Sequence, residues 1–354
     1  MSQANKFAAQ ILEASAAAYA GYAASLLLER HPDLEKRYAP AAMSDWKAHL
    51  TQRVLELAAA LGAEEPQIFA SRVVWAGKSF RARDLDDEDL HQGLLCLREV
   101  LGEELPGMAR DTVSGYLETA LNYLQKPLAS HRIGLDPSEP SARLALQYLQ
   151  AVLDGHPHRA IDLVVEAVDE GLSTRDAYIG VLIPALQEVG NMWHIGELNI
   201  AEEHFVTATT ERAMSILAHR AKRAEPIGKT MIAAAVAGNT HGLGARILAD
   251  FFELAGWNAI CLSADVPATD IANSVVYFNA DLVVLSAALS TQLKAVNQTM
   301  TTLRSIKDRE IKVLVGGSAF DDAPDLWQRI GADGYAPRAD KAVGIAAEFF
   351  DDLA

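Results

Sequence analysis

The last third of the chain consists of short apolar segments that alternate with amphipathic helices, and this alternation restricts the possible folds more than any other feature. The apolar segments have the length of strands and lie at residues 230–237, 258–263, 281–287 and 312–315. Helical patterns lie near residues 242–255, 267–278, 291–306 and 340–352. Apolar strands that alternate with helices are typical of a parallel sheet covered on both faces, the doubly wound type. Such sheets bind ligands at the carboxyl ends of their strands, so the loops after the four segments are the first candidates for a site.

Composition excludes several classes of protein. The chain has 354 residues, 50% of them hydrophobic, which suits roughly two to three domains with sizeable cores. Its net charge of −16 repels phosphate groups, so we expect no direct binding to nucleic acid or to a membrane. Two cysteines, Cys96 and Cys261, cannot form a disulfide framework or a cysteine-rich zinc site. We expect a cytoplasmic protein, because the start lacks a signal-peptide pattern and no apolar run approaches about 20 residues.

Two helical regions precede the α/β region of residues 228–354. Residues 1–127 predict an all-α bundle or globin-like fold, with helices in 7–28, 46–61, 67–82, 90–101 and 109–125. Residues 128–142 are rich in proline and serine and are expected to be a linker. Residues 143–223 predict a four-helix bundle with helices in 143–153, 158–171, 174–193 and 200–222. Gly196 is expected to end the third of these helices, and Asn199 to cap the fourth with Glu202 as its capping-box partner.

The loop after the first predicted strand reads Gly238-Asn239-Thr240-His241-Gly242-Leu243-Gly244. A histidine in a glycine-rich turn at the carboxyl edge of a parallel sheet can project away from the sheet. Gly244 lets a bulky group lie close to the following helix. From this loop alone, His241 is either a ligand or a loop histidine that hydrogen-bonds locally. A nucleotide-binding loop is disfavoured, because its G-x-G-x-x-G fingerprint requires a different glycine spacing.

Three further loops join the histidine loop in a recognisable set. The second strand ends in Ser263-Ala264-Asp265-Val266-Pro267, the third is followed by Leu285-Ser286-Ala287-Ala288-Leu289, and the fourth by Val315-Gly316-Gly317-Ser318. Together these loops resemble the cobalamin (vitamin B12)-binding domain of methionine synthases, mutases and corrinoid proteins, a flavodoxin-like Rossmannoid fold. In that family the histidine of an Asp-x-His-x-x-Gly loop replaces the dimethylbenzimidazole base below cobalt, and the displaced base inserts into the sheet. The resemblance implies that His241 is the lower axial cobalt ligand. It also implies that the cofactor contacts Asn239, Thr240, Gly242, Gly244, Ser286, Leu289, Gly316 and Gly317.

Asn239 departs from the family pattern, which has an acidic residue at this position. A metal-bound histidine donates its second N–H group to such a partner, which orients the ring and raises its basicity. An amide oxygen can accept the same hydrogen bond but lends the imidazole less basicity. We therefore expect weaker ligation of cobalt by His241 than in relatives that have an aspartate.

The predicted four-helix bundle contains a second motif, Trp193 followed after nine residues by Glu203-His204. Taken singly, Trp193 could be a core residue and Glu203-His204 part of a solvated first turn. The whole spacing, directly before a cobalamin domain, resembles the helical cap of light-sensing adenosylcobalamin-dependent repressors of carotenoid synthesis. The resemblance implies that Trp193 packs on the adenosyl group and that Glu203 and His204 contact it. It also implies that His194 ligates the upper face of cobalt after light breaks the cobalt–carbon bond, a role that suits imidazole.

The N-terminal region lacks the basic helix-turn-helix domain of those repressors and instead resembles the globin-like domain of photocobilins, which pair cobalamin with biliverdin. Arg72, Arg81 and Arg83, with Lys78, surround Trp75 and Phe80 and are candidates for binding the two propionates of a bilin. A solvated basic helix face is an equally open interpretation of these cations. His31, His49 and His91 could instead be haem ligands. Cys96 lies among leucines and is expected to be a core residue rather than a bilin attachment site.

The sequence therefore predicts a photoreceptor, not an enzyme, that uses adenosylcobalamin and biliverdin as chromophores. Loss of the adenosyl group is expected to change the conformation of the cap, and with it a light-dependent homo-oligomer or a partner contact. One alternative is a corrinoid methyl-carrier protein of a methyltransferase system, which needs an open upper face on the cobalt. A second alternative is a haem or gas sensor whose C-terminal domain has lost its role.

Overall fold

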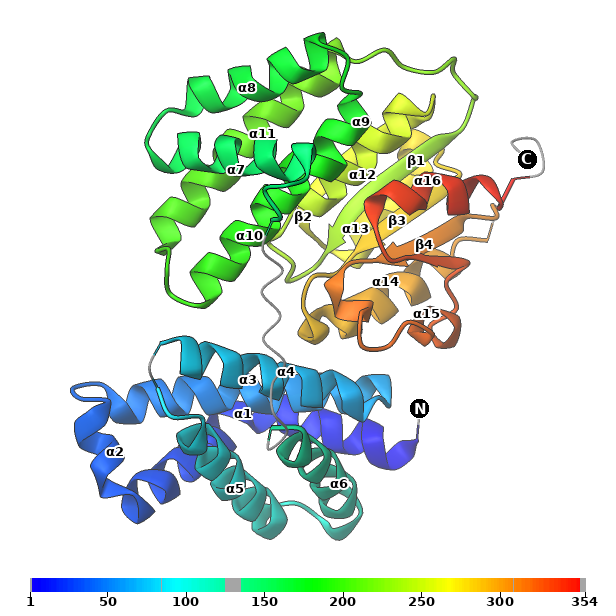
Figure 1. The fold of residues 1–354 in the computed structure, drawn as a ribbon. Coiled ribbons are helices and arrows are strands. Elements are labelled where there is room, and N and C mark those ends of the chain that lie inside the picture. The colour runs from blue at the N-terminus through cyan, green and yellow to red at the C-terminus, as the bar shows by residue number, and fades with distance from the viewer. Residues whose placement is uncertain (1, 84, 125–134, 308, 351–354) are drawn as a thin grey trace.

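The computed structural model describes residues 2–83, 85–124, 135–307 and 309–350, and it places a helical bundle beside a helical cap and an α/β domain (Figure 1). The N-terminal bundle consists, within the described residues, of α1 (Gln3–Arg30), α2 (Pro32–Arg37), α3 (Ala42–Ala63), α4 (Pro66–Ala82), α5 (Asp87–Glu104) and α6 (Gly107–Leu124). The sequence analysis predicts all of these helices except the short α2. The predicted linker lies partly outside the described residues, since residues 125–134 are not described.

Helix α1 packs against the bundle through a face made mostly of alanines. Its buried residues are Ala8, Ala9, Leu12, Ala16, Ala20, Ala23, Ala24 and Leu27, and they face α3, α5 and α6. The small alanine side chains let these helices approach closely. By length and composition alone, α1 could also cross a membrane, which the sequence analysis did not anticipate. In the structure other helices of the bundle cover the alanine-rich face of α1, and 33% of its apolar window is buried.

The cap is the predicted four-helix bundle, formed by α7 (Pro140–Leu153), α8 (Pro157–Asp169), α9 (Thr174–Ala177) with α10 (Ile183–His194), and α11 (Ile200–Arg220). A π-helical turn at Tyr178–Leu182 joins α9 to α10. Pro184, which follows this turn, has no N–H group to give to the helix, so it favours such an irregular turn. Within the cap core, Tyr178 donates a hydrogen bond of 2.8 Å to Asp250 Oδ2 in the α/β domain, which ties the two units together.

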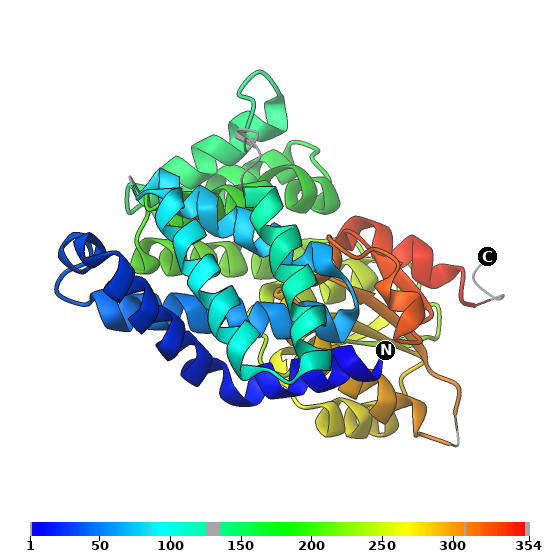
Figure 2. The same cartoon turned by 90° about the horizontal axis from the view of Figure 1, so that it is seen from below.

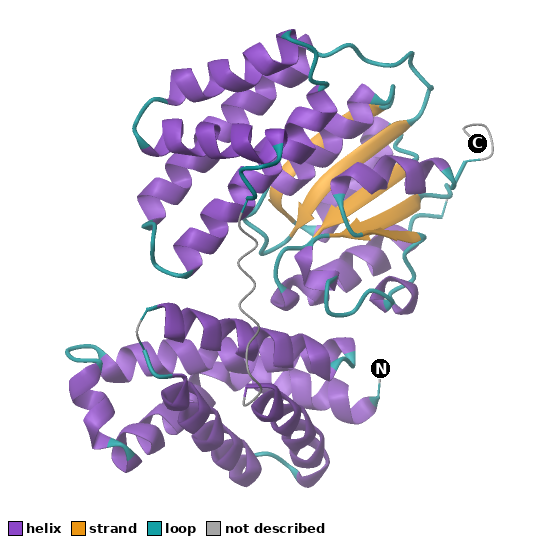
Figure 3. Cartoon of the chain, viewed as in Figure 1, coloured by secondary structure: helices purple, strands orange, loops and turns teal. Residues whose placement is uncertain are grey.

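The α/β domain contains one sheet, drawn in orange in Figure 3. Its parallel strands are β1 (Thr230–Val236), β2 (Asn258–Val266), β3 (Leu282–Ser286), β4 (Lys312–Gly316) and β5 (Gly334–Ala336), in the order β2-β1-β3-β4-β5. Helices α12 (Leu243–Leu254) and α16 (Ala339–Ala347) cover one face, and α13 (Ala268–Phe278) and α14 (Leu293–Arg304) cover the other. The predicted parallel sheet is confirmed. The sequence analysis missed β5 and the short α15 (Leu326–Arg329), because neither is long enough to show a hydrophobic period.

The strand register determines which loops meet at the carboxyl edge of the sheet. Ala235 of β1 pairs with Ser286 of β3, Ser286 with Gly316 of β4, and Gly316 with Ala336 of β5. The ends of these four strands therefore lie in one row. This row brings the histidine loop next to the serine–leucine loop and the glycine pair, as the sequence analysis expects for a ligand site at this edge.

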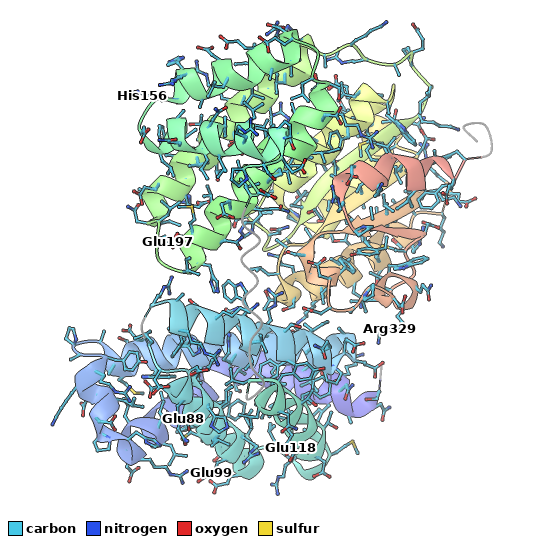
Figure 4. All side chains as sticks on the ribbon, viewed as in Figure 1. Glu88, Glu99, Glu118, His156, Glu197 and Arg329 are labelled. Atoms are coloured by element: carbon cyan, nitrogen blue, oxygen red, sulfur yellow. The ribbon has the colours of Figure 1, made fainter. Side chains whose placement is uncertain are left out.

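The N-terminal bundle faces that edge of the sheet (Figures 1 and 2). Helix α3 contacts the short η2 turn (Ser290–Gln292) after β3. Ser71 of α4 donates a hydrogen bond of 2.7 Å to Asp322, which lies in the loop after β4. Arg329, on the bundle side of the α/β domain, pairs with Glu65 at 3.6 Å (Figure 4). A ligand at the carboxyl edge would therefore be close to all three units.

Candidate functional site

The histidine loop begins where β1 ends, and Asn239 determines how it presents His241. The Asn239 side chain is fully buried, and its Oδ1 atom accepts hydrogen bonds from the backbone N–H of His241 at 3.1 Å and from Nδ1 of the His241 ring at 3.2 Å. Because Nδ1 carries the proton in this bond, Nε2 keeps its lone pair. The ring itself is exposed at the carboxyl edge. His241 is therefore set up to ligate a metal ion through Nε2.

Asn239 has a second hydrogen bond that an ionised aspartate could not make. Its Nδ2 group donates to the backbone carbonyl of Ser286 at 3.1 Å, and this bond joins the loops after β1 and β3. A carboxylate in the same place would set a negative oxygen against that carbonyl, because an ionised carboxylate only accepts hydrogen bonds. The Asn239 amide thus accepts the hydrogen bond from the His241 ring that the family's acidic residue would accept. It also holds the neighbouring loop in place through Ser286.

Two residues that the sequence analysis did not select hold the loops of this edge in place. Asp265, near the end of β2, accepts a hydrogen bond of 2.7 Å from the Gly238 N–H and donates its own N–H to Asn239 O at 2.9 Å. Gln292 accepts hydrogen bonds from the backbones of Ala288 and Leu289 and donates to Gly238 O at 3.2 Å. The position of Asp265, a polar residue at the end of a predicted strand, could have indicated this role. No sequence pattern signals Gln292, which acts across 54 residues.

The glycines of the predicted site serve two different purposes. Gly316 and Gly317 allow close packing of the strand ends, because a Cβ atom there would lie 2.6 Å from Ala336 O and 2.2 Å from Ala287 O respectively. A Cβ atom at Gly244 would instead meet the Ser286 hydroxyl at 3.4 Å. A cleft with a volume of about 320 Å³ opens beside Gly244, lined by residues of the cap and of the loop after β5. Gly244 thus lines this cleft, with the Ser286 hydroxyl beside it.

The motif residues of the cap lie at the turn between α10 and α11. Helix α10 ends as predicted at Gly196, whose φ is +79° and whose N–H donates to Trp193 O, while the N–H of Glu197 donates to Met192 O. The predicted capping box of Asn199 and Glu202 is also present. Trp193 is 39% exposed, which is unusual for a large aromatic side chain in a bundle. Glu203 forms a 2.5 Å hydrogen bond with the exposed His204.

His194 is in contact with the N-terminal bundle. Its ring stacks on the ring of Trp75 in α4, with centroids 3.6 Å apart and an interplanar angle of 18°. The His194 Nε2–H group donates to Trp75 O, and the Ser79 hydroxyl donates to His194 O, both at 3.2 Å. Burial lowers the pKa of His194, and the nearby charges of Arg83 and Lys78 lower it further, which favours the neutral imidazole. The structure thus places a metal-competent histidine in the contact between cap and bundle.

The three predicted propionate-binding arginines do not converge on one site. Arg72 lies 3.7 Å from Asp322, Arg81 pairs with Asp87 at the start of α5, and Arg83 packs beside Gly196. Arg72 and Arg81 are nine residues apart on α4, which places them on opposite sides of the helix. Each of these cations therefore has a different protein neighbour.

The other candidate residues of the bundle are also in distinct environments. Cys96 is 2% exposed, so its predicted core position is confirmed. Burial lowers the pKa of His49 to about 3, with a further contribution from Arg53, while His91 lies 3.3 Å from Glu88 on the surface of α5. His31 stands at the junction of α1 and α2.

These observations define a class of protein. A parallel α/β domain presents a histidine with a free Nε2 at its carboxyl edge, Gly244 lines a cleft beside that edge, and a helical cap offers an exposed tryptophan. Imidazole is a borderline ligand that suits cobalt, so the residues present fit a corrinoid whose cobalt His241 would hold.

Comparison with known proteins supports this class. Two family models, each described as a B12 binding domain, match residues 229–344 and residues 144–218. A corrinoid protein of Desulfitobacterium hafniense is 30% identical over 203 residues, which are 56% of this chain and 93% of that protein. This chain belongs to the family of B12-binding proteins.

Two more relatives extend the comparison. The HTH-type transcriptional repressor CarH of Myxococcus xanthus is 26% identical over 226 residues, which are 63% of this chain and 74% of the repressor. The monomethylamine corrinoid protein of Methanosarcina barkeri has the same fold over 59% of this chain and 99% of its own, with a TM-score of 0.52 and 21% identity. The names of these relatives describe corrinoid proteins and a transcriptional repressor, in agreement with a chain that binds cobalamin.

Proposed function

We propose that this chain is a cytoplasmic photoreceptor that binds adenosylcobalamin between the cap and the α/β domain and biliverdin on the N-terminal bundle. The observation that carries the proposal is the position of His194. The resemblance assigns His194 to the cobalt in the lit state. The same side chain stacks on Trp75, with centroids 3.6 Å apart, and this contact joins the cap to the bundle. A change at the cofactor can therefore reach a second domain through one side chain.

The proposed roles of the chain's residues follow from their environments. His241, oriented by Asn239, would hold the cobalt, and Trp193 would pack against the adenosyl group. When bound, adenosylcobalamin supplies a cobalt–carbon bond that light breaks, which frees the upper face of the metal. Burial lowers the pKa of His194 and so favours the neutral imidazole, which can then serve as a ligand, but only if it leaves the Trp75 stack. Departure of the His194 ring removes the stack on Trp75 and the hydrogen bond to Trp75 O, and so loosens the bundle or alters a light-dependent homo-oligomer.

A corrinoid methyl-carrier is the second candidate function, and the 30% identity to a corrinoid protein favours it. A carrier must expose the upper face of its cobalt to a partner. In this chain α4 lies against the end of α10, at the side of the cap where the upper face would be. A carrier therefore requires the contact between α4 and α10 to open for a partner protein. The proposed photoreceptor requires it to change after illumination.

The experiment compares absorption spectra of the full chain, loaded with adenosylcobalamin, in the dark and after illumination. The proposal predicts that the dark spectrum is that of an alkylated cobalamin and the lit spectrum that of cobalamin with imidazole on both faces. His194→Ala should still lose its adenosyl group but should show imidazole on one face only, because bond breaking belongs to the cofactor. His158→Ala, an exposed histidine of α8, is the matched control and should behave as wild type. Identical lit spectra for wild type and His194→Ala would refute the role of His194, and no light response in wild type would favour the carrier.

A further inference from the structure

The turn after β3 contains a buried glutamine whose side chain connects two loops of the carboxyl edge. Gln292 is 4% exposed and lies at the end of the η2 turn. Its Oε1 atom accepts hydrogen bonds from the backbone N–H groups of Ala288 at 2.8 Å and of Leu289 at 3.0 Å. Its Nε2 group donates to the carbonyl oxygen of Gly238 at 3.2 Å. One amide therefore joins the serine–leucine loop to the histidine loop.

The hydrogen bonds of Gln292 require an amide in one orientation. The N–H groups of Ala288 and Leu289 need an acceptor, so the amide oxygen faces them and the NH2 group faces Gly238 O. A carboxylate in the same place could still accept both N–H groups. Its second oxygen would lie against the Gly238 carbonyl, because an ionised carboxylate has no proton to donate. Gln292→Glu therefore removes the connection to the histidine loop and keeps the connection within its own turn.

Gln292 acts on the peptide group that leads into Asn239. The Gly238 carbonyl belongs to the peptide bond between Gly238 and Asn239, and the N–H group of the same peptide donates to Val236 O at 2.9 Å. Gly238 has a φ of +78°, and a glycine leaves this peptide plane free to rotate unless other groups restrain it. Because a peptide group is planar, bonds to both its oxygen and its N–H group fix its orientation. The orientation of this plane determines the direction of the Asn239 side chain.

Asn239 passes this orientation on to His241. The Asn239 Oδ1 atom accepts the hydrogen bond from the His241 ring at 3.2 Å, and its Nδ2 group donates to Ser286 O at 3.1 Å. A rotation of the Gly238–Asn239 peptide would turn Oδ1 away from the ring. The ring would then lose the partner that keeps its proton on Nδ1 and leaves Nε2 free. The state of His241 therefore depends on Gln292 through two intermediate residues.

The turn that carries Gln292 is itself held in place. The hydroxyl group of Ser318, after β4, donates to Ala288 O at 2.7 Å, and the N–H group of Gln292 donates to Leu289 O at 2.9 Å. Helix α3 of the N-terminal bundle contacts the same turn. A turn that is restrained from several sides gives the Gln292 side chain a fixed reference point, so the histidine loop is restrained by it.

We propose that Gln292 is a positioning residue for cobalt ligation, which holds the Gly238–Asn239 peptide so that His241 keeps its Nε2 atom free for the metal. This inference rests on the proposed function, in which His241 holds the cobalt. Gln292 itself is assigned no contact with the cofactor. It acts only through the hydrogen bonds that lead from its amide to the His241 ring.

The test uses the full chain and compares three variants of α14 and the turn before it. Gln292→Glu removes only the hydrogen bond to Gly238. Gln292→Met removes all of the amide's hydrogen bonds without adding a buried charge, and it serves if the buried carboxylate prevents folding. The matched control, Gln298→Glu, adds the same charge at an exposed position of α14. Each variant is titrated with adenosylcobalamin in the dark, alone and combined with His241→Ala.

We expect Gln292→Glu to bind adenosylcobalamin about tenfold more weakly than wild type, since residues that orient a metal ligand change metal affinity by about this factor. Gln298→Glu should bind normally. In the His241→Ala background, Gln292→Glu should cause no further loss of affinity, because two substitutions that act through one residue are not additive.

Two spectroscopic measurements report on His241 directly. In the ligand-free chain with isotope-labelled histidine, NMR should show the His241 ring of wild type with its proton on Nδ1, and that of Gln292→Glu exchanging between both tautomers. In the chain loaded with cob(II)alamin, electron paramagnetic resonance should show a splitting from the labelled histidine nitrogen. The share of this histidine-ligated form should be smaller in Gln292→Glu than in wild type. His241→Ala identifies both signals.

The outcomes separate a positioning role from a role in the turn alone. Gln292→Glu keeps the bonds to Ala288 and Leu289, so a role in the turn alone predicts wild-type affinity and wild-type spectra, and that result would overturn the proposal. An equal loss of affinity with and without His241 would also overturn it, because the effect would then not pass through His241. If wild type shows no splitting from histidine nitrogen, cobalt ligation by His241 fails as part of the proposed function. The ligand-free tautomer measurement would in that case still decide whether Gln292 positions the ring.

Discussion

The contact between Trp75 and His194 should restrain the lit state, and removing the Trp75 ring should release that restraint. In the structure the two rings are stacked with centroids 3.6 Å apart, and the His194 Nε2–H donates to the Trp75 carbonyl. Since the hydrogen bond uses the backbone, Trp75→Ala removes only the stacking. Stacking of this kind contributes about 0.5 to 1.5 kcal/mol. Trp75 is 42% exposed, so the substitution leaves no large cavity in the bundle.

The magnitude of the effect follows from competition for one imidazole. His194 must leave Trp75 to ligate cobalt, so loss of about 1 kcal/mol of stacking should favour ligation about fivefold. The assay adds free imidazole to the lit protein and measures the concentration that displaces His194 from the metal. Trp75→Ala should require about five times more imidazole than wild type. His194→Ala sets the baseline, because in that variant free imidazole meets no competitor from the cap.

Two controls separate this effect from a general change in the bundle. Trp75→Phe keeps an aromatic face and should lie between wild type and Trp75→Ala. Tyr22→Ala removes a side chain of α1 that is 62% exposed and should leave the imidazole concentration unchanged. If Trp75→Ala needs the same or less imidazole than wild type, the stacked contact does not restrain His194, and the proposed path from cofactor to bundle fails.

Four further predictions concern other parts of the molecule. Asn239→Ala should weaken cobalamin binding about tenfold to a hundredfold in a titration, because it removes the partner of His241 Nδ1, and an unchanged affinity would contradict the assigned orientation. Gly317→Ala should lower the free energy of unfolding by about 1 to 3 kcal/mol in urea, because φ is +99° and the new Cβ would meet Ala287 O; a neutral effect would contradict this packing. The pKa of His49 falls from 6.5 to about 3 on folding, so the unfolded chain binds more protons between these values and stability should fall with decreasing pH, by up to about 1.4 kcal/mol per pH unit. His49→Phe should remove this part of the pH dependence, and parallel curves for the two proteins would refute it. Biliverdin should bind without a covalent bond, because Cys96 is buried and Cys261 lies in β2 of the α/β domain, so neither is in a plausible attachment setting; zinc-induced bilin fluorescence on the protein band of a denaturing gel would show otherwise.

The sequence predicts the parallel sheet and the cap because long periodic segments determine them. The apolar runs of β1 and β3 and the helical spacing of α7 to α11 are each local, and so are the capping box at Asn199 and the helix end at Gly196. Strand β5 has three residues and forms only because β4 offers it a partner, so no local pattern reveals it.

The parts of the site that the sequence did not predict depend on contacts between distant residues. Trp75 and His194 are 119 residues apart, and Gln292 and Gly238 are 54 apart. Neither pair leaves a periodic signal, because each contact arises only when two separately folded units meet. Arg72, Arg81 and Arg83 show the converse, because they are close in the sequence but do not lie at one site.

The central claim is that His241 binds cobalt from below and that His194 moves from Trp75 to the metal in the light. A pair of crystal structures of the chain with adenosylcobalamin, one kept in the dark and one illuminated before freezing, tests it most directly. The account predicts His241 bonded to cobalt in both structures. It predicts the His194 ring stacked on Trp75 in the dark, as it is here with centroids 3.6 Å apart, and bonded to cobalt after illumination. A lit structure in which His194 remains on Trp75, or a dark structure in which His241 does not contact cobalt, would contradict it.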